Sequence, residues 1–176
     1  MHLLDRFKYC PACGSKNFLE NDFKSKHCKD CGFTYYLNAS GATAAFILNS
    51  KGELLVARRA NEPARGTLDL PGGFVDPGES IEDGMMREIK EETGAKAVKV
   101  EYAFSQYNWY EYSGMQIPTC DAFFYVTLEE DSAVTPADDC EELIWMSLDK
   151  INPANFGLTS IRLAVERLLC ERKIKS

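Results

Sequence analysis

The sequence predicts an α/β fold, an α/β sandwich with a mixed sheet, preceded by a small cysteine-bearing segment. Short apolar runs of strand character are mixed with a few helical segments from residue 38 onward. A loop rich in glycine and proline opens a helix within residues 72–95. Two cysteine pairs stand within the first 37 residues, and the 176-residue length suits one ordinary domain with an appendage. We therefore expect domains at residues 1–37 and 38–176.

The first segment carries two closely spaced cysteine pairs, Cys10 with Cys13 and Cys28 with Cys31. Each C-x-x-C pair lets two thiolates converge from one tight turn, and four thiolates form the tetrahedral sulfur set that suits Zn²⁺. The segment is too short for a core of its own, so a metal would supply folding energy. A thioredoxin-like redox role is the weaker alternative, because no βαβ pattern surrounds either pair. We expect a structural zinc ribbon.

Two further features of the ribbon bear on its partners. His27 precedes Cys28 and is an alternative ligand, although four thiolates already complete a set. Five lysines make the ribbon locally basic, which leaves contact with an anionic partner open: Lys8, Lys16, Lys24, Lys26 and Lys29.

The next residues predict the strands that lead to the glycine-rich loop. Ala42–Leu48 is typical of a buried strand, and residues 49–52 have turn chemistry. Glu53–Arg59 is expected to be the hairpin partner of that strand. Thr67–Leu70 is expected to be a short strand that delivers Pro71 and the two glycines after it.

The residues after 95 predict three more strands and a closing helix. Strands are expected at 97–110, 119–128 and 143–146. An amphipathic helix follows residue 159, with apolar residues at helical spacing: Ile161, Val165, Leu168 and Leu169.

The segment 72–95 is the most informative part of the sequence. Ser80 is a natural N-cap for a helix, with Asp83 three residues later, and Gly94 supplies a left-handed residue that ends it. At about 100° per residue, three glutamates fall on one helix face roughly 100° wide: Glu88, Glu91 and Glu92. Like charges so close destabilise a helix unless they are solvated or bind a cation. Carboxylate clusters suit hard ions such as Mg²⁺ or Mn²⁺, and a solvated helix end is the alternative.

The whole pattern is more specific than the glutamates alone. Gly73 is followed after five residues by Glu79, and after seven more by Arg87 and Glu88 at the start of a Glu-rich run. This pattern resembles the signature of the Nudix hydrolases and agrees with it at every specified position. The resemblance implies a Nudix-type α/β/α sandwich. Only Gly84 and Met85, within the helix, replace the alanine common in that family, and Gly84 should cost about 1 kcal/mol of helix propensity.

The resemblance also implies site roles and an activity. Glu88, Glu91 and Glu92 correspond to the metal-binding and base carboxylates, and Gly72 or Gly73 to the residue whose carbonyl faces the metal. Arg87 and Glu79 correspond to an orienting ion pair. The implied activity is that of a pyrophosphohydrolase: metal-dependent attack of water on the phosphoanhydride of a nucleoside diphosphate linked to another moiety. Members differ in the general base, so later acidic residues stay candidates: Glu111, Asp138, Asp139, Glu141 and Glu142.

The substrate is less well defined by the sequence. A zinc ribbon followed by a Nudix domain loosely resembles the NADH pyrophosphatase group, which implies NADH, ADP-ribose or a nucleotide sugar. Ser105 and Gln106 match that group's motif, but its prolines are missing. We expect Arg58, Tyr107 and Trp109 to contact the substrate, with a solvated charge and core packing as the alternatives. An RNA cap-directed pyrophosphohydrolase and a non-catalytic nucleotide-binding or zinc-mediated interaction module remain alternative functions.

Composition restricts partners and location. The formal net charge of −7 makes nucleic acid an unlikely partner, because binding relies on basic residues that neutralise phosphates. No apolar run reaches about 18 residues, so no membrane span is expected. Seven cysteines without a secretory signal favour a cytoplasmic protein, with Cys120, Cys140 and Cys170 as small core residues. A homodimer stays open.

Overall fold

The computed structural model describes residues 2–129, 133–136 and 140–175. The chain forms two compact units, Met1–Ala39 and Ser40–Ser176. No helix within the described ranges is long and apolar enough to cross a membrane.

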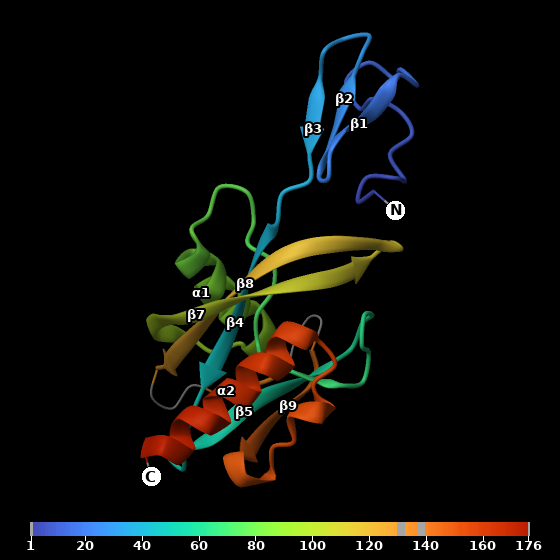
Figure 1. Ribbon diagram of the computed structural model, residues 1–176. Coiled ribbons are helices and arrows are strands. Elements are labelled where there is room, and N and C mark those ends of the chain that lie inside the picture. The colour runs from blue at the N-terminus through green and yellow to red at the C-terminus, as the bar shows by residue number, and fades with distance from the viewer. Residues whose placement is uncertain (1, 130–132, 137–139, 176) are drawn as a thin grey trace. The chain divides into compact units, whose positions relative to one another are not determined.

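The first unit is a three-stranded antiparallel sheet of β1 (Phe18–Asp22), β2 (Ser25–Cys28) and β3 (Thr34–Tyr36), in the order β1-β2-β3 (Figure 1). Its buried cluster consists of Cys10, Phe18 and Cys28, with Phe7 and Tyr35 packed against it. Such a core is too small to stabilise a fold alone.

Within its described residues, the second unit contains two three-stranded sheets. In one, β8 (Met115–Leu128) lies between β4 (Ser40–Ile47), to which it is parallel, and β7 (Ala97–Tyr112), to which it is antiparallel. In the other, β5 (Glu53–Arg59) lies between β6 (Leu68–Asp69) and β9 (Cys140–Ser147), antiparallel to both. The mixed sheet that the sequence predicted is confirmed.

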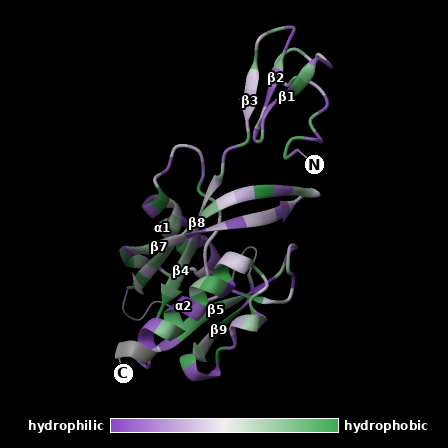
Figure 2. Cartoon of the chain, viewed as in Figure 1, coloured by the Kyte–Doolittle hydropathy of each residue, from purple (hydrophilic) through white to green (hydrophobic). Residues whose placement is uncertain are grey.

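Two helices cover the strands, α1 (Ile81–Thr93) and α2 (Thr159–Lys175), and the 3₁₀ turns η1 (Leu148–Lys150) and η2 (Pro153–Asn155) precede α2. Alternate residues of β4 enter two separate cores. Ala44 and Phe46 pack in the cluster that includes α2, whereas Ala45 and Ile47 pack in the cluster that includes α1. Since successive strand residues face opposite sides, the helices cover opposite faces of β4. β4 and β5 are accordingly mostly hydrophobic (Figure 2).

The predicted hairpin between residues 42–48 and 53–59 is wrong. Gly52 closes the expected turn onto Asn49, but only an isolated bridge, Leu48 with Leu54, joins the two strands. One edge of β4 pairs with β8, and the loop after β6 occupies the other edge. The N–H groups of Thr43 and Ala45 donate to the carbonyls of Gly73 and Pro71, each at 2.8 Å. The glycine-rich loop therefore takes the place at β4 that the prediction gave to β5.

The prediction that the dispersed cysteines are core residues is also wrong for Cys120 and Cys170, which are exposed. Apolar neighbours in the sequence do not decide which face a strand residue occupies. Cys120 lies on β8 between Thr119 and Asp121, which are buried on the other face. The side chain of Cys140 lies outside the described part of the structure.

Candidate active site

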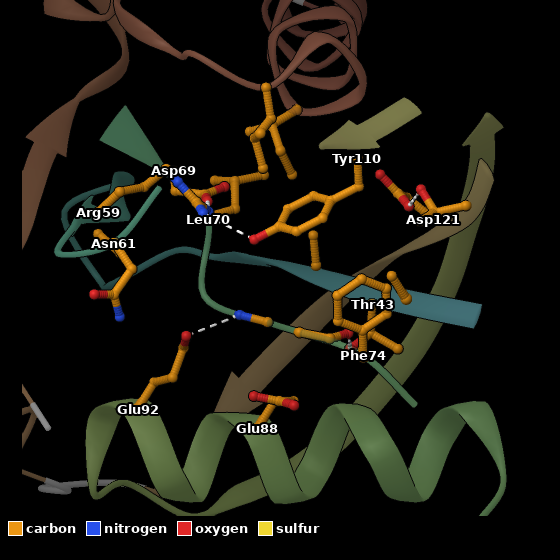
Figure 3. A pocket seen from close by; sticks show the side chains of 18 of the residues that line it. Thr43, Arg59, Asn61, Asp69, Leu70, Phe74, Glu88, Glu92, Tyr110 and Asp121 are labelled. Carbon is orange, nitrogen blue, oxygen red and sulfur yellow. Dashed lines mark hydrogen bonds and ion pairs between the residues drawn. The ribbon is translucent and has the colours of Figure 1, made fainter. Parts of the chain in front are cut away.

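Helix α1 begins and ends as the sequence predicted. The Ser80 hydroxyl accepts a hydrogen bond from the Asp83 N–H at 3.1 Å, and Gly94, at φ 68°, donates its N–H to the Lys90 carbonyl. Met85 and Ile89 bury one face of the helix in the core. This packing fixes the rotation of α1 and turns its glutamates toward the loop after β6 (Figure 3).

The loop passes so close to its neighbours that two positions require glycine. Gly72 has φ 147°, and a Cβ there would lie 2.2 Å from the Thr43 carbonyl oxygen. A Cβ at Gly73 would lie 2.6 Å from Glu88 Oε1. The Gly72 N–H donates to Glu92 Oε2 at 2.9 Å, which orients that carboxylate. The Gly73 carbonyl accepts the Thr43 N–H, so β4, the loop and α1 are held together at this point.

Arg87 is the cation at the centre of the glutamates. Its Nη2 and Nε donate to the two oxygens of Glu79 at 2.7 and 3.1 Å. Its Nη1 lies 2.9 Å from Glu88 Oε1 and 2.8 Å from Glu91 Oε2. The guanidinium also donates to the Phe74 carbonyl. One arginine therefore ties the loop to three carboxylates, in the forked geometry that lysine could not provide.

Glycine at position 84 has a local reason. A Cβ there would lie 2.9 Å from Glu79 Oε1, so the glycine lets the Glu79 carboxylate approach the helix. The missing Cβ therefore leaves space beside the helix for the ion pair of Glu79 with Arg87.

The environment shifts the pKa values of two glutamates in opposite directions. Burial raises the pKa of Glu88, and the neighbouring Arg87 only partly opposes this. Hydrogen bonds from Arg87 lower the pKa of Glu79. Glu88 therefore holds its negative charge at greater cost than an exposed glutamate, which a bound cation would relieve.

A cavity of about 490 Å³ opens beside these residues. Its lining includes Glu88, Glu91 and Glu92 from α1 together with Gly72 and Gly73. Polar side chains from strands β5 to β8 form a wall on its other side, and apolar residues such as Leu158 and Ile161 complete the lining. Figure 3 shows Tyr110 between Asp121 on one side and the Arg59 and Asp69 side chains on the other, with Glu88 and Glu92 across the cavity.

The polar wall is held by buried interactions. Arg59 pairs with Asp69 and donates to the Tyr110 hydroxyl at 3.2 Å. Burial raises the pKa of Asp69 although Arg59 opposes this. Tyr110 meets Phe74 edge-on, with ring centroids 5.3 Å apart. The wall thus joins β5, β6 and β7 to the loop that carries Gly72 and Gly73.

The four cysteines of the first unit form a second candidate site. Their sulfur atoms all lie within 4.8 Å of one another. Cys10 and Cys31 are 3.7 Å apart, as are Cys13 and Cys28. Tetrahedral ligands at a Zn–S distance of about 2.3 Å would be about 3.8 Å apart, so the cluster fits such an ion. His27 is not in the cluster, and its Nδ1 bonds with the Thr34 hydroxyl.

Comparison with known proteins identifies the family. A family model described as the NUDIX domain matches residues 39–164, which include the glycine-rich loop and α1. The chain belongs to the NUDIX domain family.

Curated relatives and solved structures agree with this assignment. NAD-capped RNA hydrolase NudC of Pseudomonas aeruginosa is 26% identical over 165 residues, which are 94% of this chain and 56% of the relative. The protein of the same name from Chromobacterium violaceum is 28% identical over 166 residues, 92% of this chain and 59% of the relative. The chain thus spans less than two thirds of these relatives.

Among solved structures, a NUDIX hydrolase from Nitrosomonas europaea aligns with a TM-score of 0.72 at 24% identity, over 94% of this chain and 92% of its own. The NUDIX domain of Shewanella oneidensis NrtR, solved with ADP ribose, aligns with a TM-score of 0.60 at 19% identity, over 77% and 88%. These two likenesses confirm the Nudix fold.

The residues expected to contact substrate divide into two groups. Arg58 lines the cavity, but its guanidinium bonds with Glu142 and with the Gly66 carbonyl. Tyr107 and Trp109 do not line the cavity and are 75% and 47% exposed. They occupy the strand positions that alternate with Asn108 and Tyr110, which do line it. The alternation of side chains along β7 shows that these two pairs of residues face opposite sides of the sheet. The sequence alone does not show which side faces the cavity.

Other residues were missed or stay outside the site. Sequence reasoning did not single out Asn108, Tyr110, Asp69 or Asp121, because they come from three separate strands. The later acidic candidates Glu111, Glu141 and Glu142 are exposed and do not line the cavity. Asp138 and Asp139 lie outside the described residues.

The pKa of Glu79 predicts a pH-dependent stability. A carboxyl whose pKa is lower in the folded chain stabilises the fold above its unfolded pKa, and this stabilisation is lost as the pH falls through the folded pKa. Glu79→Gln should therefore be less stable than wild type at neutral pH, and the difference should shrink as the pH falls below about 5. Urea denaturation at a series of pH values measures the difference in the free energy of unfolding between Glu79→Gln and wild type. Glu82→Gln, on the exposed first turn of α1, is the control, and a pH-independent difference for Glu79→Gln would refute the ion-pair account.

Proposed function

We propose that the chain hydrolyses the phosphoanhydride bond of a nucleoside diphosphate linked to another moiety. The observation that carries this proposal is that three carboxylates, from Glu88, Glu91 and Glu92, line one cavity beside the Gly72–Gly73 loop. A solvated helix end would not need a glycine loop packed against Glu88 or a backbone N–H aimed at Glu92.

The same three carboxylates would hold Mg²⁺ or Mn²⁺. They are oxygen ligands, as hard ions prefer, and the raised pKa of Glu88 indicates a negative charge that its surroundings only partly compensate. The carbonyl of Gly72 or Gly73 would be a further ligand. When bound, such ions neutralise phosphate charge and lower the pKa of a bound water.

Side chains and backbone groups of this chain position the carboxylates and take the proton of the attacking water. Arg87 and Glu79 hold the loop and α1 in register, so that the carboxylates keep their positions while a substrate enters. The Gly72 N–H fixes Glu92. A carboxylate of this set that is not fully engaged with metal takes the proton of the attacking water.

The cavity supports a small-molecule substrate. Its volume of about 490 Å³ lies within the roughly 300–1,000 Å³ of typical ligand sites. The curated relatives are named for an NAD cap, and one similar structure was solved with ADP ribose; both compounds are nucleoside diphosphates joined to another group. We therefore propose NADH, ADP-ribose or a nucleotide sugar as the substrate class.

A second candidate is removal of an NAD-type cap from RNA, which the names of the curated relatives favour. The first unit carries six Lys and Arg against four Asp and Glu, although the whole chain has a net charge of −7. A basic ribbon is the part of this acidic protein suited to an RNA backbone.

A hydrolysis screen tests the proposal. Wild type should split at least one of NADH, ADP-ribose, nucleotide sugars, dinucleoside polyphosphates or NAD-capped RNA at its phosphoanhydride, in the presence of Mg²⁺ or Mn²⁺. Glu91→Gln should lower the rate at least about 100-fold, because it removes a charged group that touches the reacting centre. Glu91 is half exposed, so the variant should fold. Chromatography with mass detection resolves the products.

The exposed Glu82→Gln on the same helix is the matched control and should keep the wild-type rate. If folded wild type cleaves no compound with either ion, the hydrolase proposal fails and a nucleotide-binding module takes its place. Cleavage of capped RNA in preference to free NADH would favour the second candidate.

For the first unit we propose a structural Zn²⁺ held by Cys10, Cys13, Cys28 and Cys31. The 3.7 Å sulfur separations and the small buried cluster support this, because metal binding would supply the folding energy that the core lacks. Four reduced thiols would suit a cytoplasmic location.

The zinc proposal predicts one Zn²⁺ per chain by elemental analysis of the purified protein. Cys13→Ser should lose most of that metal, because three thiolates leave the tetrahedral set incomplete. Cys120→Ser, at an exposed cysteine outside the cluster, should keep it. Equal zinc content in the two variants would contradict the assignment.

A further inference from the structure

The polar wall of the cavity contains a buried amide with a free hydrogen-bonding capacity. Asn108 lines the cavity and is only 6% exposed. Within the described ranges its side chain has no hydrogen-bond partner, and no fully buried polar side-chain atom there is unsatisfied. The amide therefore opens onto the cavity. Buried polar groups are normally paired, so this amide is placed to bind something that enters.

A carboxylate lies beside this amide on the same face of the sheet. Asn108 pairs with Thr119 across β7 and β8, so Asp121, two residues along β8, is its diagonal neighbour. Asp121 is also 6% exposed and lines the cavity. Figure 3 shows Asp121 at an end of the cavity away from Glu88 and Glu92, and the strand register places Asn108 on the same face beside it.

Asp121 is held by hydroxyl groups rather than by a cation. Its oxygens accept hydrogen bonds from Thr119 Oγ1, at 2.5 Å, and from the Ser160 hydroxyl on α2. Among the described residues no Lys, Arg or His forms an ion pair with it. A carboxylate has about four acceptor positions, so two remain for a ligand. A buried carboxylate without a counter-ion is costly, and a hydrogen-bond donor from a ligand would reduce that cost.

The residues around Asp121 restrict which chemical group of a ligand can donate a hydrogen bond to it. Leu158 and Ile161 line the cavity with apolar surface, and Tyr110 and Phe74 present aromatic rings. A phosphate is disfavoured at this end, because the carboxylate of Asp121 would repel it. A flat ring suits the apolar and aromatic surface, and its edge must offer an N–H to Asp121. The amide of Asn108 can meet either a donor or an acceptor on that edge.

We propose that Asn108 and Asp121 form a ring-recognition pocket for the non-phosphate end of the substrate. The pocket binds a planar nitrogen heterocycle that carries an amino or carboxamide group, through an N–H to Asp121 and a second hydrogen bond with Asn108. Thr119 and Ser160 are positioning residues that orient the carboxylate. This inference rests on the proposed function, since it assumes that the phosphates lie at the glutamates, and it identifies the part of the substrate that gives specificity.

Equilibrium binding of three probes tests the pocket independently of turnover. The probes are NADH, its hypoxanthine analogue, in which the adenine amino group becomes a carbonyl, and its acetylpyridine analogue, in which the carboxamide becomes a methyl ketone. Calorimetry on the full chain carrying Glu91→Gln measures each dissociation constant. We expect one analogue to bind about 10-fold or more weakly than NADH, because one hydrogen bond to a buried carboxylate is lost.

Two variants in the same background then test the residues. Asp121→Asn, which keeps the shape of the side chain, and Asn108→Leu should each weaken NADH binding and reduce the preference for NADH over that analogue. Cys120→Ser lies between Thr119 and Asp121 but is exposed, and it should keep the full preference. If Asn108→Leu fails to fold, the shape-conserving Asp121→Asn still tests the pocket.

The outcomes separate the pocket from the proposed reaction. Equal affinity for all three probes, a preference that survives in both variants, or no binding of any probe would overturn the pocket. A clear preference that both variants abolish, in a protein that cleaves nothing in the hydrolysis screen, would support the pocket and overturn the hydrolase proposal.

Discussion

Charge repulsion on α1 is the constraint on which the site depends. Glu88 and Glu91 share one helix face, and Glu79 is brought beside them, so the fold needs cations among them. Arg87 supplies one by reaching all three carboxylates, yet the pKa of Glu88 remains raised by burial. The compensation is therefore incomplete, which leaves a site whose stability a divalent ion would increase. We regard this incomplete compensation as the physical basis of the metal dependence that we propose.

The glycine-rich loop gives this helix its place in the fold. The loop bonds with the edge of β4 and also contacts Glu88 and Glu92. The position of β4 therefore determines where the loop meets these carboxylates. Because the loop occupies this edge of β4, β5 pairs with β6 and β9 in the second sheet instead. The space between the two sheets becomes the cavity, and its polar wall faces the glutamates (Figure 3). The pairing of this loop with β4 thus positions both halves of the candidate site.

Local chemistry made part of this structure predictable. The cap of α1 at Ser80, the end at Gly94 and the shared face of the glutamates depend on neighbours within a few residues, and the sequence predicted them. The pairing of β4 and the cavity face of β7 depend on distant segments. Residues 49–52 have good turn chemistry, but this could not show that a loop some twenty residues later takes the strand edge. Asn108 and Asp121 come together only through the β7–β8 register, which leaves no local pattern.

The central claim is that the glutamates of α1 form a divalent-ion site, and calorimetric titration with Mn²⁺ tests it most directly. Wild type and Glu88→Gln would be compared, with circular dichroism to show that both are folded and Glu82→Gln as the surface control. The account predicts that wild type and Glu82→Gln bind Mn²⁺ at least about 10-fold more tightly than Glu88→Gln. Equal affinity in all three folded proteins would contradict it.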